Sequence, residues 1–334
     1  MSPAKKALAI AAVAATSLIS ACSSNPTTNA SPAGSDRQIV DKSIWPKETP
    51  VTGLMKGLKL PLENYMLSYA DTVAIDQAKN TLQKQCMAEY GFTVDFPKPG
   101  ANPPPSNNDA NIERRYGITD ATVAKTYGYG IPEELTHHTD QAVQELSDVE
   151  VEVLTGHTKP EKVAPPKDAE ADGPYFAAPP KTKPARAEHN GKKLRRGGCA
   201  GWSDEQLGAA KQKADAFLVS DLNGDSLVRS QQSEPVQDVF KDWSSCMKTK
   251  GHAGLADPYK AMDAGLALDK DGKATEESIR MALDDIACKE QTGLVKVWFD
   301  EESKIQNQQI EDNKAKLDSA KESKKAVLAK ADAQ

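Results

Sequence analysis

Cysteine is the residue type in this chain whose number and spacing point to chemistry. The 334 residues include five cysteines, Cys22, Cys86, Cys199, Cys246 and Cys288. A thiol can be acylated, oxidised to a disulfide, bound to a metal ion or used as a nucleophile. If Cys22 is set aside, an even number remains, which favours disulfides wherever the compartment is oxidising.

The residues before Cys22 predict export and lipid attachment. Lys5 and Lys6 form a short basic region, and residues 7–18 are apolar apart from two hydroxyl side chains. That run is too short to span a bilayer but suits a signal peptide. The segment Leu18-Ile19-Ser20-Ala21-Cys22 resembles a bacterial lipobox, so we expect cleavage after residue 21 and a diacylglyceryl group on Cys22. An ordinary secretory peptide or a cytosolic N-terminus is the alternative.

The segment after Cys22 predicts a tether. Residues 23–35 consist almost wholly of Ser, Asn, Thr, Pro, Ala and Gly, a composition typical of flexible linkers. We therefore assign residues 1–21 to a signal peptide and 22–45 to a disordered tether. A diacylated cysteine anchors stably, which predicts a body held at the extracytoplasmic face of the cell membrane.

Two similar segments predict how the other four cysteines pair. Cys86-Met87 and Cys246-Met247 each sit near a predicted helix end, and a glycine follows four residues after each Met. Cys199 and Cys288 each follow one of these segments and lie in different contexts. We therefore expect Cys86–Cys199 and Cys246–Cys288, which the loop-entropy model values at about 4 to 5 kcal/mol each.

Other uses of the thiols are disfavoured. The chain has no Cys-x-x-Cys or His-x-x-x-His spacing, and its five histidines are scattered, so we predict no metal site and no cofactor. Gly197-Gly198-Cys199 could present a nucleophile to His189 or His252, but an oxidised thiol cannot attack. The motifs of serine hydrolases, metalloproteases and P-loop enzymes are absent. We therefore name no catalytic residues.

A calcium site is one further candidate. Residues 221–225 read Asp-Leu-Asn-Gly-Asp, which places oxygen ligands at the first, third and fifth positions of an EF-hand loop. Ser226 replaces the glycine needed at the sixth position, and Gln232 replaces the carboxylate at the twelfth. A polar loop between helices is the favoured interpretation.

Two other groups of residues have both a binding and a structural interpretation. Lys192, Lys193, Arg195 and Arg196 form a dense basic cluster that could meet anionic wall polymers or lipid head groups. The favoured alternative is a solvated turn beside a disulfide.

Tyr116, Tyr127 and Tyr129 alternate with glycines and could stack on sugars. Tyrosines in that setting more often fill a helical core.

Several motifs together resemble an uncharacterised family of secreted and lipid-anchored proteins from actinobacteria. They are the paired Cys-Met segments, Arg115-Tyr116-Gly117-Ile118, Val153-Leu154-Thr155-Gly156, Gly197-Gly198-Cys199 and Trp298-Phe299. The resemblance spans residues 73–313. It implies an exported location and a disulfide framework, and it transfers no catalytic residue.

The cysteines and the other candidate residues are expected to be held by helices that are separated by irregular inserts. Apolar spacing and capping residues predict a mainly α fold, an irregular disulfide-linked body at 46–317 with a disordered Pro-rich insert at 157–190 and a charged, frayed helical tail at 318–334. Asn190-Gly191 predicts at most a short β-hairpin. The expected helices cover residues 62–90, 120–127, 139–154, 204–219, 235–250, 275–289 and 294–317.

Composition limits the function. The mature chain carries about eight more acidic than basic side chains, which disfavours nucleic acid as a partner. We predict a non-enzymatic envelope module that is anchored to the membrane and contacts an envelope protein or a cell-wall polymer. The alternatives are a wall or peptide hydrolase with a carboxylate-based site and, third, a solute-binding protein.

Overall fold

The computed structural model describes residues 40–103, 112–132, 143–160 and 181–334, and Cys22 lies outside them. Ten α-helices and one two-stranded sheet occur in these residues, as the mainly α prediction requires. Both predicted disulfides, Cys86–Cys199 and Cys246–Cys288, are present. Residues 39–334 form one compact unit that is distinct from the N-terminal segment.

The first helical layer joins α1 to α4, α5 and the hairpin. Ser68 caps α1 (Tyr69–Glu89), which follows the short 3-10 helix η2 (Pro61–Tyr65). Cys86 near the end of α1 is bonded to Cys199 in the first turn of α5 (Gly198–Leu207). Val153 of α4 (Asp148–Thr155) packs into the same small core.

A close backbone approach explains two glycines in this layer. A Cβ atom on Gly198 would lie 2.5 Å from the Leu154 carbonyl oxygen, and one on Gly156 would lie 2.9 Å from Gly197. Both glycines have positive φ, which disfavours any other residue. The motifs around Val153 and Cys199 therefore form a single contact between α4 and α5.

The hairpin follows the prediction. β1 (Glu188–His189) and β2 (Lys192–Lys193) pair antiparallel around Asn190-Gly191. Both turn residues have positive φ, at 50° and 71°, as a type I′ turn requires.

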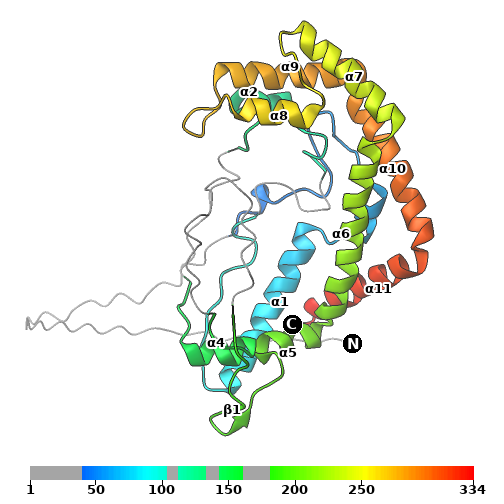
Figure 1. Cartoon of the computed structure of the whole chain (residues 1–334). Helices are drawn as coiled ribbons and strands as arrows, with labels where there is room; N and C mark the ends of the chain where they lie inside the picture. The colour runs from blue at the N-terminus through cyan, green and yellow to red at the C-terminus, as the bar shows by residue number, and fades with distance from the viewer. Residues whose placement is uncertain (1–39, 104–111, 133–142, 161–180) are drawn as a thin grey trace, which may run out of the picture. The chain divides into compact units, whose positions relative to one another are not determined.

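Long helices connect this layer to the main core. α6 (Ala209–Gln231) packs against α10 (Leu294–Asp312) and α11 (Lys314–Ala331), and Figure 1 shows α6 running between α5 and α7. The main core gathers α2 (Ala121–Tyr127), α7 (Glu234–Thr249), α8 (Pro258–Leu266) and α9 (Glu276–Thr292) around Trp243 and Trp298. Cys246–Cys288 ties α7 to α9.

Several expected helix boundaries are wrong. The helix expected at 204–219 is divided in two, because Gly208, with a φ of 72°, ends α5 at Leu207 and α6 begins at Ala209. The helix expected at 139–154 begins only at Asp148 among the described residues, since Ser147 forms a capping box with Glu150. The tail expected at 318–334 is helical as predicted and belongs to α11, but its Ala320 and Val327 are buried, so it is not frayed.

The predicted Pro-rich insert lies partly outside the described residues. Its described end is ordered, because Thr158 and Lys183 exchange two hydrogen bonds beside the bridge between His157 and Pro184. Within the described residues, none of the helices has the length and apolarity needed to cross a membrane.

Candidate functional site

A cleft beside the C-terminal end of α2 is the candidate site. Its volume is about 860 Å³, which falls within the usual range for ligand pockets. One wall comes from Tyr127 and the residues after it, the opposite wall from Met262 and Leu266 of α8, and the rim from the turn between α8 and α9.

The first wall is fixed by a helix end and an arginine. Asp120 caps α2 through the amides of Thr122 and Val123, and Gly128 ends the helix with a φ of 55°. Arg114 then donates hydrogen bonds of 2.9 and 2.7 Å to the carbonyl oxygens of Tyr129 and Gly130. Burial lowers the pKa of the Arg114 guanidinium, and the two carbonyls give this buried cation its partners.

The opposite wall approaches because α8 has a glycine at the contact. The ring of Tyr129 lies against Gly265, where a Cβ atom would fall 2.2 Å from the ring. Tyr129 is therefore a core residue that holds α2 and α8 together. Its neighbour Tyr127 is the half-buried aromatic side chain on the cleft wall.

The rim is a tight turn that carries charge. Asp271 and Gly272 both have positive φ, and they close a two-residue turn in which Lys270 and Lys273 exchange main-chain hydrogen bonds of 3.0 and 2.9 Å. Asp269 and Asp271 bring two carboxylates to the cleft, and Lys273 brings an ammonium group.

Two features of the cleft suit a ligand. Ile131 and Leu266 remain 36% and 42% exposed, so apolar surface at the rim is left uncovered by the described residues. The Oδ1 atom of Asp269 is buried without a hydrogen-bond partner in the described part of the chain. A buried acceptor of this kind costs about 1 to 3 kcal/mol until a donor reaches it.

The structure separates the three candidate tyrosines. Tyr127 lines the cleft, whereas the rings of Tyr129 and Tyr116 are buried in the main core. Tyr116 stacks on Trp298 at 4.8 Å and donates a 2.8 Å hydrogen bond to Glu302. Only Tyr127 therefore retains the possible role in stacking.

A buried polar network around Glu302 was not predicted from the sequence. Arg115 forms an ion pair with Glu302, and Ser226 donates a 2.8 Å hydrogen bond to the same carboxylate. Gln306 extends the network to Asn223 at 3.1 Å. Burial opposes the charge on Arg115, but its hydrogen bonds to Glu302 leave the guanidinium pKa raised. Because its members satisfy one another, this network is structural.

The calcium-like segment belongs to that network and not to a loop. Residues 221–225 lie inside α6, where Asn223 and Ser226 face Glu302 and Gln306. The favoured interpretation as an interhelical loop is thus wrong. The described residues contain no group of three or more His, Cys, Asp or Glu side chains arranged to hold a metal ion.

A second buried ion pair supports the main core. Lys289 and Asp285 are fully buried with 3.0 Å between Nζ and Oδ2. Lys289 also donates to the Ile118 carbonyl at 2.8 Å, and Trp243 donates to Asp285 at 2.9 Å. Burial raises the pKa of Asp285 and lowers that of Lys289. No charge in this pair is available to a ligand.

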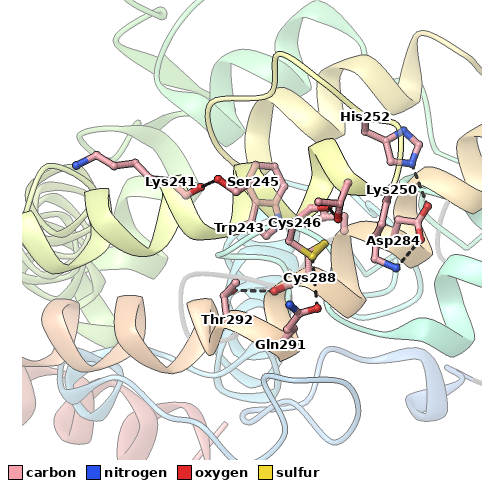
Figure 2. The surroundings of a disulfide bond; sticks show 12 residues. Lys241, Trp243, Ser245, Cys246, Lys250, His252, Asp284, Cys288, Gln291 and Thr292 are labelled. Atoms are coloured by element: carbon pink, nitrogen blue, oxygen red, sulfur yellow. Dashed lines mark hydrogen bonds and ion pairs between the residues drawn. A yellow bond between two sulfur atoms is a disulfide. The ribbon is translucent and has the colours of Figure 1, made fainter.

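All four cysteines of the body are oxidised to disulfides and have no thiol to use in chemistry. Figure 2 shows Cys246 bonded to Cys288, with His252 and Lys250 directed toward Asp284 and away from the sulfur atoms. The His252 ring nitrogen lies 3.0 Å from Asp284 and the Lys250 ammonium 3.1 Å from it. Cys199 is bonded to Cys86, so it has no thiol that His189 or His252 could activate as a nucleophile.

Glu63, a carboxyl group with a raised pKa, lies beside a different and smaller cavity. Glu63 is 4% exposed, and burial raises its pKa to about 7 although Leu60 donates a 2.7 Å hydrogen bond to it. The cavity beside it, of about 120 Å³, is also lined by Lys59, Asp71 and Lys324. This volume is below the range of ligand pockets.

No known protein family, curated protein or solved structure matches this chain. The resemblance to secreted actinobacterial proteins therefore stays a prediction.

Proposed function

We propose that the protein is a membrane-anchored, extracytoplasmic binding module that takes a segment of a cell-wall polymer into the cleft beside α2. The anchor would be the lipid on Cys22, and the tether would hold the body outside the cell membrane. Two disulfides in the body support an oxidising compartment.

The cleft is the observation that carries the binding role. Tyr127, Met262 and Leu266 offer an apolar and aromatic surface, and Asp269 offers an acceptor to which no described residue donates. A wall fragment matches both, because a sugar ring has an apolar face and its hydroxyl and amide groups supply donors. The chemistry needed is recognition, with no bond made or broken.

A hydrolase has less support in the structure. A general acid works best with a pKa near the operating pH and within reach of its substrate. Glu63 has such a pKa, but its cavity of about 120 Å³ is too small for a polymer segment. The raised pKa of Asp285 belongs to a carboxyl group enclosed with Lys289 and Trp243.

Binding to soluble wall fragments tests the cleft. Isothermal titration of the unacylated chain beginning at Ser23 should detect a glycan–peptide fragment. Tyr127→Ala removes the aromatic face, and Asp269→Asn replaces one acceptor oxygen by an amide donor, so each should weaken binding by about tenfold, which is about 1.4 kcal/mol. The exposed Asp242, on α7, gives the matched control Asp242→Asn. Equal affinity of all variants for the fragment would exclude this cleft as the binding site. If the protein bound an envelope protein and no wall fragment, its partner would be that protein and not the polymer.

Intact mass tests the anchor separately. Protein purified from its native membrane should begin at Cys22 and carry a diacylglyceryl or triacyl mass. A mature N-terminus at another residue, without acyl mass, would contradict the anchor. The binding role of the cleft would be unaffected, because the isothermal titration tests it independently.

A further inference from the structure

The hairpin region concentrates positive charge in an acidic protein. Residues 181–196 contain seven of the 42 basic side chains and one of the 48 acidic side chains. The segment is therefore formally +6 (seven minus one) in a chain of net charge −6. A field of one sign over a small area attracts an oppositely charged partner.

Part of this charge fixes the hairpin to the body. Arg195 forms a 2.8 Å ion pair with Glu89 of α1, and Arg186 forms a 2.9 Å ion pair with Glu152 of α4. Lys192 donates to the main-chain carbonyl of Glu89. These contacts use two acidic side chains, and the ion pairs of the described residues compensate no other charge of the segment.

Four cations remain exposed. Lys181, Lys183, Lys193 and Arg196 are all exposed, and none forms an ion pair with a residue in the described ranges. Exposed cations of this kind keep their hydration, so they carry no desolvation penalty in the folded protein, and they can attract anions.

The surface that carries them is ordered. Tyr90 donates a 3.0 Å hydrogen bond to the Lys193 carbonyl, and Asn190 donates a 3.2 Å hydrogen bond to the Tyr90 carbonyl. The Cys86–Cys199 disulfide closes the same region. Figure 1 shows the hairpin extending beyond α4 and α5. The cations therefore stand on a fixed platform.

We propose that this basic hairpin, residues 181–196, lies against the anionic phospholipid head groups of the membrane. The segment presents charge without an exposed large apolar side chain, which fits adsorption to phosphates at a bilayer surface and not insertion. The choice of membrane over a soluble polymer rests on the proposed lipid anchor, which would keep the hairpin near a bilayer. One lipid anchor and a basic patch reinforce each other.

Such contact would orient the body. The residues outside the hairpin are strongly acidic overall, so an anionic surface attracts the hairpin and repels the remainder. The cleft beside α2 belongs to the main core, whereas the hairpin packs on the separate core around Cys86 and Cys199. The residues that line the cleft are therefore different from those that would contact the membrane.

Vesicle sedimentation tests the contact without the anchor. The unacylated chain beginning at Ser23 contains the whole compact unit of residues 39–334. It should bind vesicles of 30% phosphatidylglycerol in phosphatidylcholine and not vesicles of pure phosphatidylcholine, and 0.5 M NaCl should release it because salt screens the attraction. Each cation contributes about fivefold at an anionic surface. Replacing Lys181, Lys183, Lys193 and Arg196 by Gln should thus reduce binding about 600-fold.

A control with the same charge change separates local from overall charge. Lys241, Lys248, Lys260 and Lys296 are exposed on helices of the main core. Their replacement by Gln should leave vesicle binding within about threefold. Circular dichroism and the absence of free thiols should show that both variants fold.

Three outcomes would overturn the proposal. They are equal binding to both kinds of vesicle, equal loss in the two variants, and binding to a soluble glycerol-phosphate polymer without binding to vesicles. The last outcome would reassign the hairpin to an anionic wall polymer. Because the tested chain carries no lipid, its failure leaves the mass test of Cys22 unaffected.

Discussion

Glu63 is a buried carboxyl group with two unequal oxygen atoms. Oε1 accepts a hydrogen bond from the Leu60 amide, whereas Oε2 is buried without a partner among the described residues. Lys59 and Arg115 favour the ionised form and Glu302 opposes it, but burial is the largest influence and raises the pKa from 4.5 to about 7. Ionised Glu63 therefore destabilises the fold.

The stability of the protein should thus fall as the pH rises toward 8. The folded-state pKa of Glu63 is above the unfolded value, so its stabilising contribution is complete below about pH 4.5 and is lost through pH 7. The loss is on the order of 3 kcal/mol at pH 8. In urea unfolding, Glu63→Gln should exceed the wild type in stability at pH 8, and the advantage should shrink toward pH 5.

A control and a contrary result are available for Glu63. Glu322 is exposed on α11, so Glu322→Gln makes the same change of side chain without altering a buried group and serves as the reference at each pH. If the stability difference between Glu63→Gln and the wild type is constant from pH 5 to pH 8, Glu63 does not titrate as proposed.

Sequence reasoning at the residue scale succeeded where the partners are close along the chain. The helix expected at 120–127 and the turn at Asn190-Gly191 depend on partners within a few positions along the chain, and both are present in the structure. Arg115 and Glu302 are 187 positions apart, and a chain with 48 acidic side chains gives no means of choosing this pair. The unpartnered oxygen of Asp269 is likewise visible only after folding.

At the scale of elements, the sequence predicts helix boundaries well where capping residues mark them. It predicts them poorly where tertiary packing, and not a cap, decides how far the helix extends. Thr275 and Gly293 delimit α9 within three residues of its expected span. The Asp-rich segment of α6 resembles a loop because Asp, Asn and Gly favour turns, but Asn223 and Ser226 find buried partners on α10 and the helix continues. Tertiary hydrogen bonds thus override a local preference.

α11 illustrates the same competition along its length. Lysines and alanines predict a frayed tail, yet Leu317, Ala320 and Val327 form an apolar stripe that is buried against its neighbours. Ser323 donates a hydrogen bond to Asp215 of α6, and Lys211 of α6 donates one to Ser319, so two polar links accompany the same contact. The cleft could not be predicted, because its walls meet only when Gly265 of α8 accepts the Tyr129 ring.

On the scale of the whole molecule, each disulfide belongs to a different core. Cys86–Cys199 lies in the small core beneath the hairpin, and Cys246–Cys288 lies in the large core around Trp243 and Trp298. The small core has fewer fully buried apolar side chains than the large core, so we expect it to depend more on its covalent link. The platform of the basic hairpin depends on the same link.

Removing the two disulfides should therefore have unequal effects. The bonds close segments of 113 and 42 residues, for which loop entropy gives about 5 and about 4 kcal/mol of stabilisation. Replacing both cysteines of a pair by Ala avoids a free thiol, and urea unfolding at pH 6 measures the cost. We expect Cys86→Ala with Cys199→Ala to lose about 1 kcal/mol more than the other pair. A larger loss from Cys246→Ala with Cys288→Ala would show that packing in the large core outweighs the entropy of the unfolded chain.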